Sequence, residues 1–175
     1  MKINLHHNKV ALLLGLLLVI NILVMRNFDK PLKNEVCLYG ITSFELAKDI
    51  SKTKVIINSW SETDKISVSM SLGFDFLFIL VYTSFITLMV YKINTKLWSG
   101  KSFYKVGKIL IYATFIAGVF DIIENISLIK LLNGSTAQVY ATTAYYFASI
   151  KFAILLIGII YLIGNWVFSI FKISR

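Results

Sequence analysis

The sequence is poor in the residue types from which disulfide frameworks and metal centres are built. It has one cysteine, Cys37, which excludes an intrachain disulfide and a cysteine-based zinc site. Its two histidines, His6 and His7, are adjacent in a polar amino-terminal tail, which excludes the H-E-x-x-H pattern of zinc hydrolases. A glycine-rich phosphate loop and a G-x-S-x-G elbow are also missing. The sequence therefore offers no established catalytic motif and indicates no particular cofactor or metal.

Charged residues are scarce as well, and long apolar runs take their place. Of 175 residues, 57% are apolar and 15% are charged, which is too apolar a composition for a soluble domain of this length. A soluble chain this short also could not build a core around apolar runs of such length. We therefore expect an integral membrane protein whose main partner is the lipid bilayer.

Four stretches are long and apolar enough to cross hydrocarbon as helices. The sequence thus predicts an all-α fold, a four-transmembrane-helix bundle that forms a single domain over residues 1–175. The expected transmembrane helices cover residues 10–27, 66–91, 109–132 and 141–168, and residues 28–65 form an outer loop. The first stretch could instead be a signal peptide. We expect a retained anchor, because the residues from Asn21 to Arg26 lack the small-x-small pattern that signal peptidase needs.

The distribution of Lys and Arg predicts the orientation. The first connection, counted from Arg26 to Lys65, mixes seven basic with six acidic residues, and the connection at residues 133–138 is uncharged. Nine basic residues without any acidic neighbour occupy the two ends and the second connection: Lys2, Lys9, Lys92, Lys96, Lys101, Lys105, Lys108, Lys172 and Arg175. The positive-inside rule then places both termini in the cytoplasm of a multi-pass cell-membrane protein. This topology explains the net charge of +9 without nucleic acid, and the lysine-rich connection would suit anionic lipid.

The outer loop has a pattern typical of a short helix. Thr42 and Glu45 have the spacing of a capping box, which predicts a helix that runs through Asp49. Two interpretations of this segment stay open: a lid over the mouth of the bundle, or a solvated loop anchored by an aromatic residue. The apolar side chains that would make such a lid or anchor are Phe44, Ala47, Ile50, Ile56, Ile57 and Trp60.

Four ionisable residues lie well inside the expected transmembrane helices: Asp75, Asp121, Glu124 and Lys151. A charge at mid-bilayer costs on the order of 3 kcal/mol on insertion scales, so such residues usually pair with one another or serve a site. At 100° per residue, Asp121, Glu124 and Asn125 share one helix face with the small residues Ala117 and Gly118. A matching stripe of small residues around Lys151, formed by Ala141, Ala144 and Ala148, is expected to dock on that face. We expect the four ionisable residues and Asn125 to form an outward-facing polar cluster that binds a ligand.

The charges of this cluster do not balance. Three carboxylates face one ammonium, which leaves about two negative charges if every group is ionised at low dielectric constant. We therefore expect the cluster to bind or transport a proton, a cation or a polar lipid headgroup. Two alternatives stay open: a lipid-directed enzyme in which a carboxylate acts as base and Lys151 polarises an oxygen, and a scaffold subunit whose ion pairs are purely structural. Binding is favoured over catalysis, and the sequence does not specify the oligomeric state.

Several short motifs carry a resemblance that spans most of the chain. They are Ser43-Phe-Glu-Leu-Ala, Ile57-Asn-Ser-Trp60, Leu72-Gly-Phe-Asp75, Phe120-Asp-Ile-Ile-Glu-Asn125 and Lys151-Phe. In this order they resemble a group of small, uncharacterised four-helix integral membrane proteins of bacteria. The resemblance implies the four-helix fold and no particular activity, substrate or cofactor.

Overall fold

A computed structural model describes residues 5–173, which form helices and no strand. Four helices are long: α1 (Leu5–Asp29), α4 (Glu62–Trp98), α5 (Tyr104–Leu132) and α6 (Gln138–Ile173). Three short helices lie between α1 and α4: η1 (Lys30–Leu32), α2 (Ile41–Glu45) and α3 (Ile50–Asn58). Each long helix has the length and the apolar composition needed to cross a membrane. The predicted all-α class with four long apolar helices is therefore confirmed.

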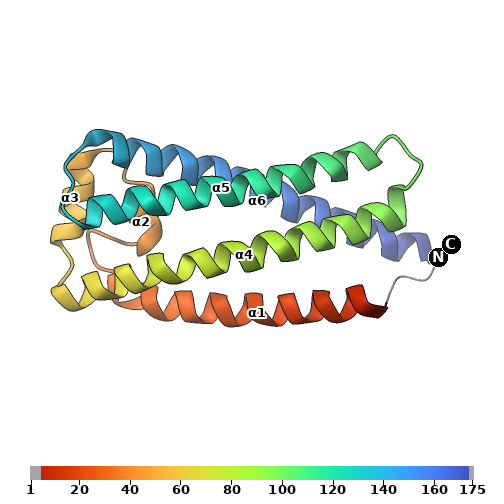
Figure 1. Ribbon diagram of the computed structural model, residues 1–175, viewed down its shortest axis with the longest axis horizontal. Coiled ribbons are helices and arrows are strands. Elements are labelled where there is room, and N and C mark those ends of the chain that lie inside the picture. Colours follow the sequence, from red (N-terminus) through yellow and green to blue (C-terminus); the bar gives the residue numbers. More distant parts are fainter. Residues whose placement is uncertain (1–4, 174–175) are drawn as a thin grey trace.

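The long helices lie roughly side by side, and the short ones gather at one end (Figure 1). α4, α5 and α6 pack against one another, while α1 lies along α4. The first turns of α1, the connection between α4 and α5 and the last turns of α6 share the opposite end of the molecule. α1 is peripheral, because only 6% of its most apolar 18-residue window is buried. The interior is therefore built mainly by α4, α5 and α6.

Each long helix continues past the apolar stretch that predicts it. α4 begins at Glu62 because Ser61 caps it: Asp64 N–H donates to the Ser61 hydroxyl at 3.2 Å, and Ser61 N–H donates to Asp64 Oδ2 at 2.9 Å. This is a complete capping box, which satisfies N–H groups that the first helical turn leaves free. Polar residues thus extend the helix beyond the part that hydropathy detects.

The capping box predicted at Thr42 and Glu45 is wrong. α2 begins at Ile41, whose N–H donates to the Asp29 carboxylate at 2.7 Å, and it stops at Glu45 instead of running through Asp49. The Glu45 side chain is 8% exposed and lies against charged residues of the long helices. The carboxylate is therefore used for a tertiary contact, and the local spacing to Thr42 is coincidental.

The segment from η1 to α3, residues 30–60, covers the ends of the long helices, and we call it the cap. Phe44 and Trp60 pack edge to face with ring centroids 5.5 Å apart, and Trp60 Nε1 donates to the Leu32 carbonyl at 3.0 Å. Of the six apolar residues expected to make a lid or anchor, Phe44, Ala47, Ile56 and Trp60 are buried, while Ile50 and Ile57 are partly buried against them. The cap shares this apolar cluster with α4, α5 and α6, so it is a packed cover and not a solvated loop.

Candidate functional site

The charged side chains inside the apolar helices meet in one buried region below the cap. α4 contributes Asp75, α5 contributes Asp121, Glu124 and Asn125, and α6 contributes Lys151. Their exposed fractions run from 0% for Glu124 to 8% for Asp75. We use the name charge cluster for these five residues together with two that the sequence analysis did not assign to the site, Glu45 of α2 and Tyr82 of α4.

Lys151 is the centre of the cluster. Its ammonium donates to Asp121 Oδ1 at 2.5 Å and forms a second ion pair with Glu124 Oε2 at 2.8 Å. The Tyr82 hydroxyl donates to the other carboxylate oxygen of Asp121 at 2.8 Å. Asp121 is thus held from two helices, and one lysine serves two carboxylates.

Asp75 and Asn125 form a second contact beside the lysine. The Asn125 amide donates to Asp75 Oδ2 at 2.5 Å, which joins α4 to α5. Asp75 lies within electrostatic reach of both Asp121 and Lys151. The five residues singled out from the sequence therefore occupy one region, although Lys151 bonds directly to only two of them.

Glu45 is one of the two cluster residues that the sequence analysis did not assign to the site. It comes from the cap, yet its carboxyl group lies close enough to Lys151, Glu124 and Asp121 to interact with them electrostatically. Burial raises the pKa of Glu45 above its ordinary value of 4.5, and Lys151 opposes only part of that shift. Within residues 5–173, its Oε2 atom is buried without a hydrogen-bond partner. A glutamate next to Phe44 in an apolar stretch was the available signal.

Small residues allow α5 and α6 to approach closely around the cluster. Ala117 of α5 and Ala141, Ala144 and Ala148 of α6 are 0–2% exposed, in agreement with the docking of small-residue faces expected from their spacing. Gly118 faces α4 and not α6, since a Cβ atom at this position would lie 2.8 Å from the Thr83 side chain of α4. The helices thus surround the charged side chains with tightly packed backbone.

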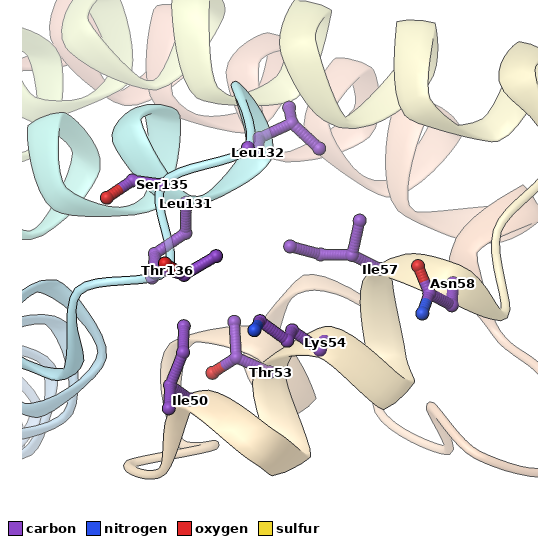
Figure 2. A pocket seen from close by; sticks show the side chains of 10 residues that line it. Ile50, Thr53, Lys54, Ile57, Asn58, Leu131, Leu132, Ser135 and Thr136 are labelled. Carbon is purple, nitrogen blue, oxygen red and sulfur yellow. The ribbon is translucent and has the colours of Figure 1, made fainter.

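The cavities found near the cap do not reach the charge cluster. One of about 220 Å³ lies between α3 and the turn that follows α5, and its lining includes Thr53, Lys54 and Leu131 (Figure 2). Another, of about 320 Å³, is lined by cap residues such as Tyr39 and Leu46. Neither is lined by a residue of the cluster. These two cavities are therefore separate from the charge cluster.

The donor set does not have the geometry of a metal centre. Within the described part of the chain, no three His, Cys, Asp or Glu side chains are grouped so that they could hold one metal ion. The carboxylates are instead distributed around the lysine.

Comparison of the chain with protein-family models, curated proteins and solved structures finds no match.

Proposed function

We propose that this chain is a cell-membrane protein that spans the bilayer four times with both termini in the cytoplasm. The support is an asymmetry of charge along the long axis. The first turns of α1 and the last turns of α6 lie at the same end of the molecule as the α4–α5 connection. Five lysines and no acidic residue occur between residues 92 and 108 in and around that connection. The cap lies at the other end and carries both signs. The positive-inside rule assigns the lysine-rich end to the cytoplasm.

We propose further that the charge cluster binds protons. The observation that carries this proposal is the imbalance of buried charge. The cluster has four carboxyl groups, those of Glu45, Asp75, Asp121 and Glu124, and one ammonium, that of Lys151. With all of them ionised, about three negative charges would remain unneutralised, and a low-dielectric interior does not sustain such a charge. Protons or other cations must therefore neutralise this excess of negative charge.

Protons fit this site better than larger cations do. The cluster residues are at most 8% exposed, and the two cavities described near the cap are lined by other residues. The Glu45 Oε2 and Glu124 Oε1 atoms lack a hydrogen-bond donor among residues 5–173, and a proton shared between carboxyl groups would supply one. Carboxyl groups that lie close together in proteins commonly share a proton for this reason. The same burial argues against a lipid-directed enzyme, which needs room for water and substrate.

The cap would control access to these protons. Glu45 enters the cluster from α2, so displacement of α2 would remove one carboxylate and open the cluster toward the outer surface. The five-residue helix lies between two residues with left-handed backbone, Gly40 with a φ of 59° and Lys48 with a φ of 66°. These two positions are where the backbone would change direction if α2 moved as a unit. Transport of protons, in addition to binding, would use this movement.

Infrared spectroscopy tests proton binding directly. The full chain is reconstituted in lipid, and the absorption of protonated carboxyl groups is recorded against pH for the wild type and for Glu45→Gln and Glu124→Gln. We expect carboxyl absorption at neutral pH in the wild type and a reduced absorption in each variant. Glu62→Gln is the matched control, because the Glu62 side chain is 89% exposed and should leave the absorption unchanged.

Two outcomes would separate the proposal from its alternatives. If the wild type lacks protonated carboxyl groups at neutral pH, every carboxylate is ionised and the cluster is a structural ion network. If they are present, vesicles loaded with a pH-sensitive dye test transport. Proton flux that Glu45→Gln reduces would support transport through the cap, whereas the absence of flux would limit the function to proton binding.

A further inference from the structure

A second polar site lies at the other end of the molecule, far from the cap. A cavity of about 210 Å³ opens between α4 and α5 beside their connection. Its lining combines one cation, three phenol rings, an amide and one aliphatic side chain: Lys108, Tyr91, Tyr104, Tyr112, Asn94 and Ile111. This site shares no residue with the charge cluster, so what it binds can be argued independently of the proton site.

Charge around this cavity is of one sign. Between Asp75 and Asp121 the sequence contains no acidic residue, and both of those side chains are buried in the charge cluster. Lys108 lies over the Tyr104 ring at 5.3 Å, and no carboxylate of residues 5–173 pairs with it. The cavity also adjoins the first turns of α5, where the helix dipole favours an anion. An anionic group is therefore the ligand that these surroundings attract.

Hydrogen bonds and close packing join the two helices that form the walls of the cavity. Asn94 is 2% exposed, and its amide donates to the Tyr104 carbonyl at 3.0 Å while it accepts a hydrogen bond from Tyr161 at 3.0 Å. Gly107 allows the close approach, since a Cβ atom at this position would overlap the Asn94 side chain. These contacts fix α4 against α5 and hold the cavity in shape.

An apolar stripe leads away from the cavity toward the middle of α5. At 100° per residue, Lys108, Tyr112, Phe115 and Val119 lie on one helix face. Tyr112 is 69% exposed, Phe115 is 55% exposed and Val119 is 52% exposed. The stripe extends about 16 Å from Lys108, at 1.5 Å of rise per residue. This is close to half of a hydrocarbon core that is about 30 Å thick, and so to the depth of one leaflet.

We propose that this cavity binds the phosphate headgroup of an anionic phospholipid, with an acyl chain laid along the stripe that begins at Tyr112. Lys108 and the hydroxyl groups of Tyr104 and Tyr112 would hold the phosphate, and Phe115 and Val119 would contact the chain. A free phosphate ion would use the cation but not the stripe. The cavity, which carries the cation, and the exposed apolar stripe together favour a lipid over a free phosphate ion.

Native mass spectrometry of the full chain tests this proposal. The protein is titrated with phosphatidylglycerol and with phosphatidylcholine of the same acyl chains, and the lipid-bound fractions give relative affinities. We expect a preference for phosphatidylglycerol that Lys108→Gln reduces about fivefold, which is the order of effect for one lysine near anionic lipid. Lys105→Gln is the matched control, because it removes the same charge from the same part of α5 without lining the cavity; it should change the affinity less than twofold.

Further measurements keep the outcome interpretable. Lys108→Arg should retain the preference, and circular dichroism must find the same helix content in all three variants. Equal losses in Lys108→Gln and Lys105→Gln would overturn the site and indicate diffuse attraction. Displacement of phosphatidylglycerol by glycerol phosphate at equal concentration would overturn the assignment to a lipid, because that competitor carries the anion without acyl chains. The absence of any preference over phosphatidylcholine would overturn the proposal outright.

Discussion

Substitution of Lys151 by methionine gives the largest effect on stability that the structure predicts. Lys151 is 4% exposed, and its ammonium lies 2.5 Å from Asp121 and 2.8 Å from Glu124. Lys151→Met preserves the length of the side chain but leaves two carboxylates buried without their cation. Removal of one partner from a buried ion pair typically costs about 3–5 kcal/mol, because the remaining charge is uncompensated. We expect a loss of this size in the free energy of unfolding, measured by circular dichroism during denaturation in mixed micelles.

Two further variants test the reasoning behind that magnitude. Lys65→Met breaks an ion pair of the same 2.8 Å length with Glu62, but this pair is exposed, so the loss should not exceed about 1 kcal/mol. The triple variant Lys151→Met, Asp121→Asn and Glu124→Gln has a neutral cluster and should recover most of the stability. A loss of unfolding free energy in Lys151→Met no larger than that in Lys65→Met would contradict the cost assigned to the buried charge. A triple variant as unstable as Lys151→Met would contradict it as well.

Two other regions give predictions of the same kind. Burial raises the pKa of Glu45 when the cap is closed, so the closed cap binds more protons than the open one and loses stability as pH rises above about 4.5. The rate at which a maleimide labels the buried Cys37, divided by the same rate in Glu45→Gln, should therefore increase with pH. A ratio that stays constant with pH would contradict this. Gly107→Ala should destabilise the chain by about 1–3 kcal/mol through overlap with Asn94, whereas Gly164→Ala, which meets no neighbour, should stabilise it or leave it unchanged; thermal unfolding of both variants checks the pair.

The sequence predicted the helices and most of the cluster for one physical reason. Long apolar runs have few alternatives to transmembrane helices, and a charge inside such a run must find partners. Asp121 and Lys151 could be placed together because small residues on α5 and α6 indicated which faces pack. Hydropathy could not predict where the helices end, since Ser61 begins α4 through hydrogen bonds that carry no apolar signal.

Glu45 could not be assigned from the sequence because its role depends on tertiary structure. The spacing of Thr42 and Glu45 fits a capping box, and only the folding of α2 over α5 and α6 brings Glu45 to the cluster. The Asp29 carboxylate takes the place of a local cap on α2 from twelve residues away, which no short pattern encodes. Sequence patterns of a few residues therefore did not predict the start and end of α2, where the chain folds back over the long helices.

The peripheral position of α1 gives this helix a mechanical consequence. Most of its surface is left to its surroundings, so the thickness of a bilayer would set its tilt more directly than that of α4, α5 or α6. α1 ends at Asp29, which holds the first turn of α2, and α2 ends at Glu45. If α1 spans a bilayer as proposed, a change in bilayer thickness would act on the position of Glu45 through the contact between Asp29 and the first turn of α2.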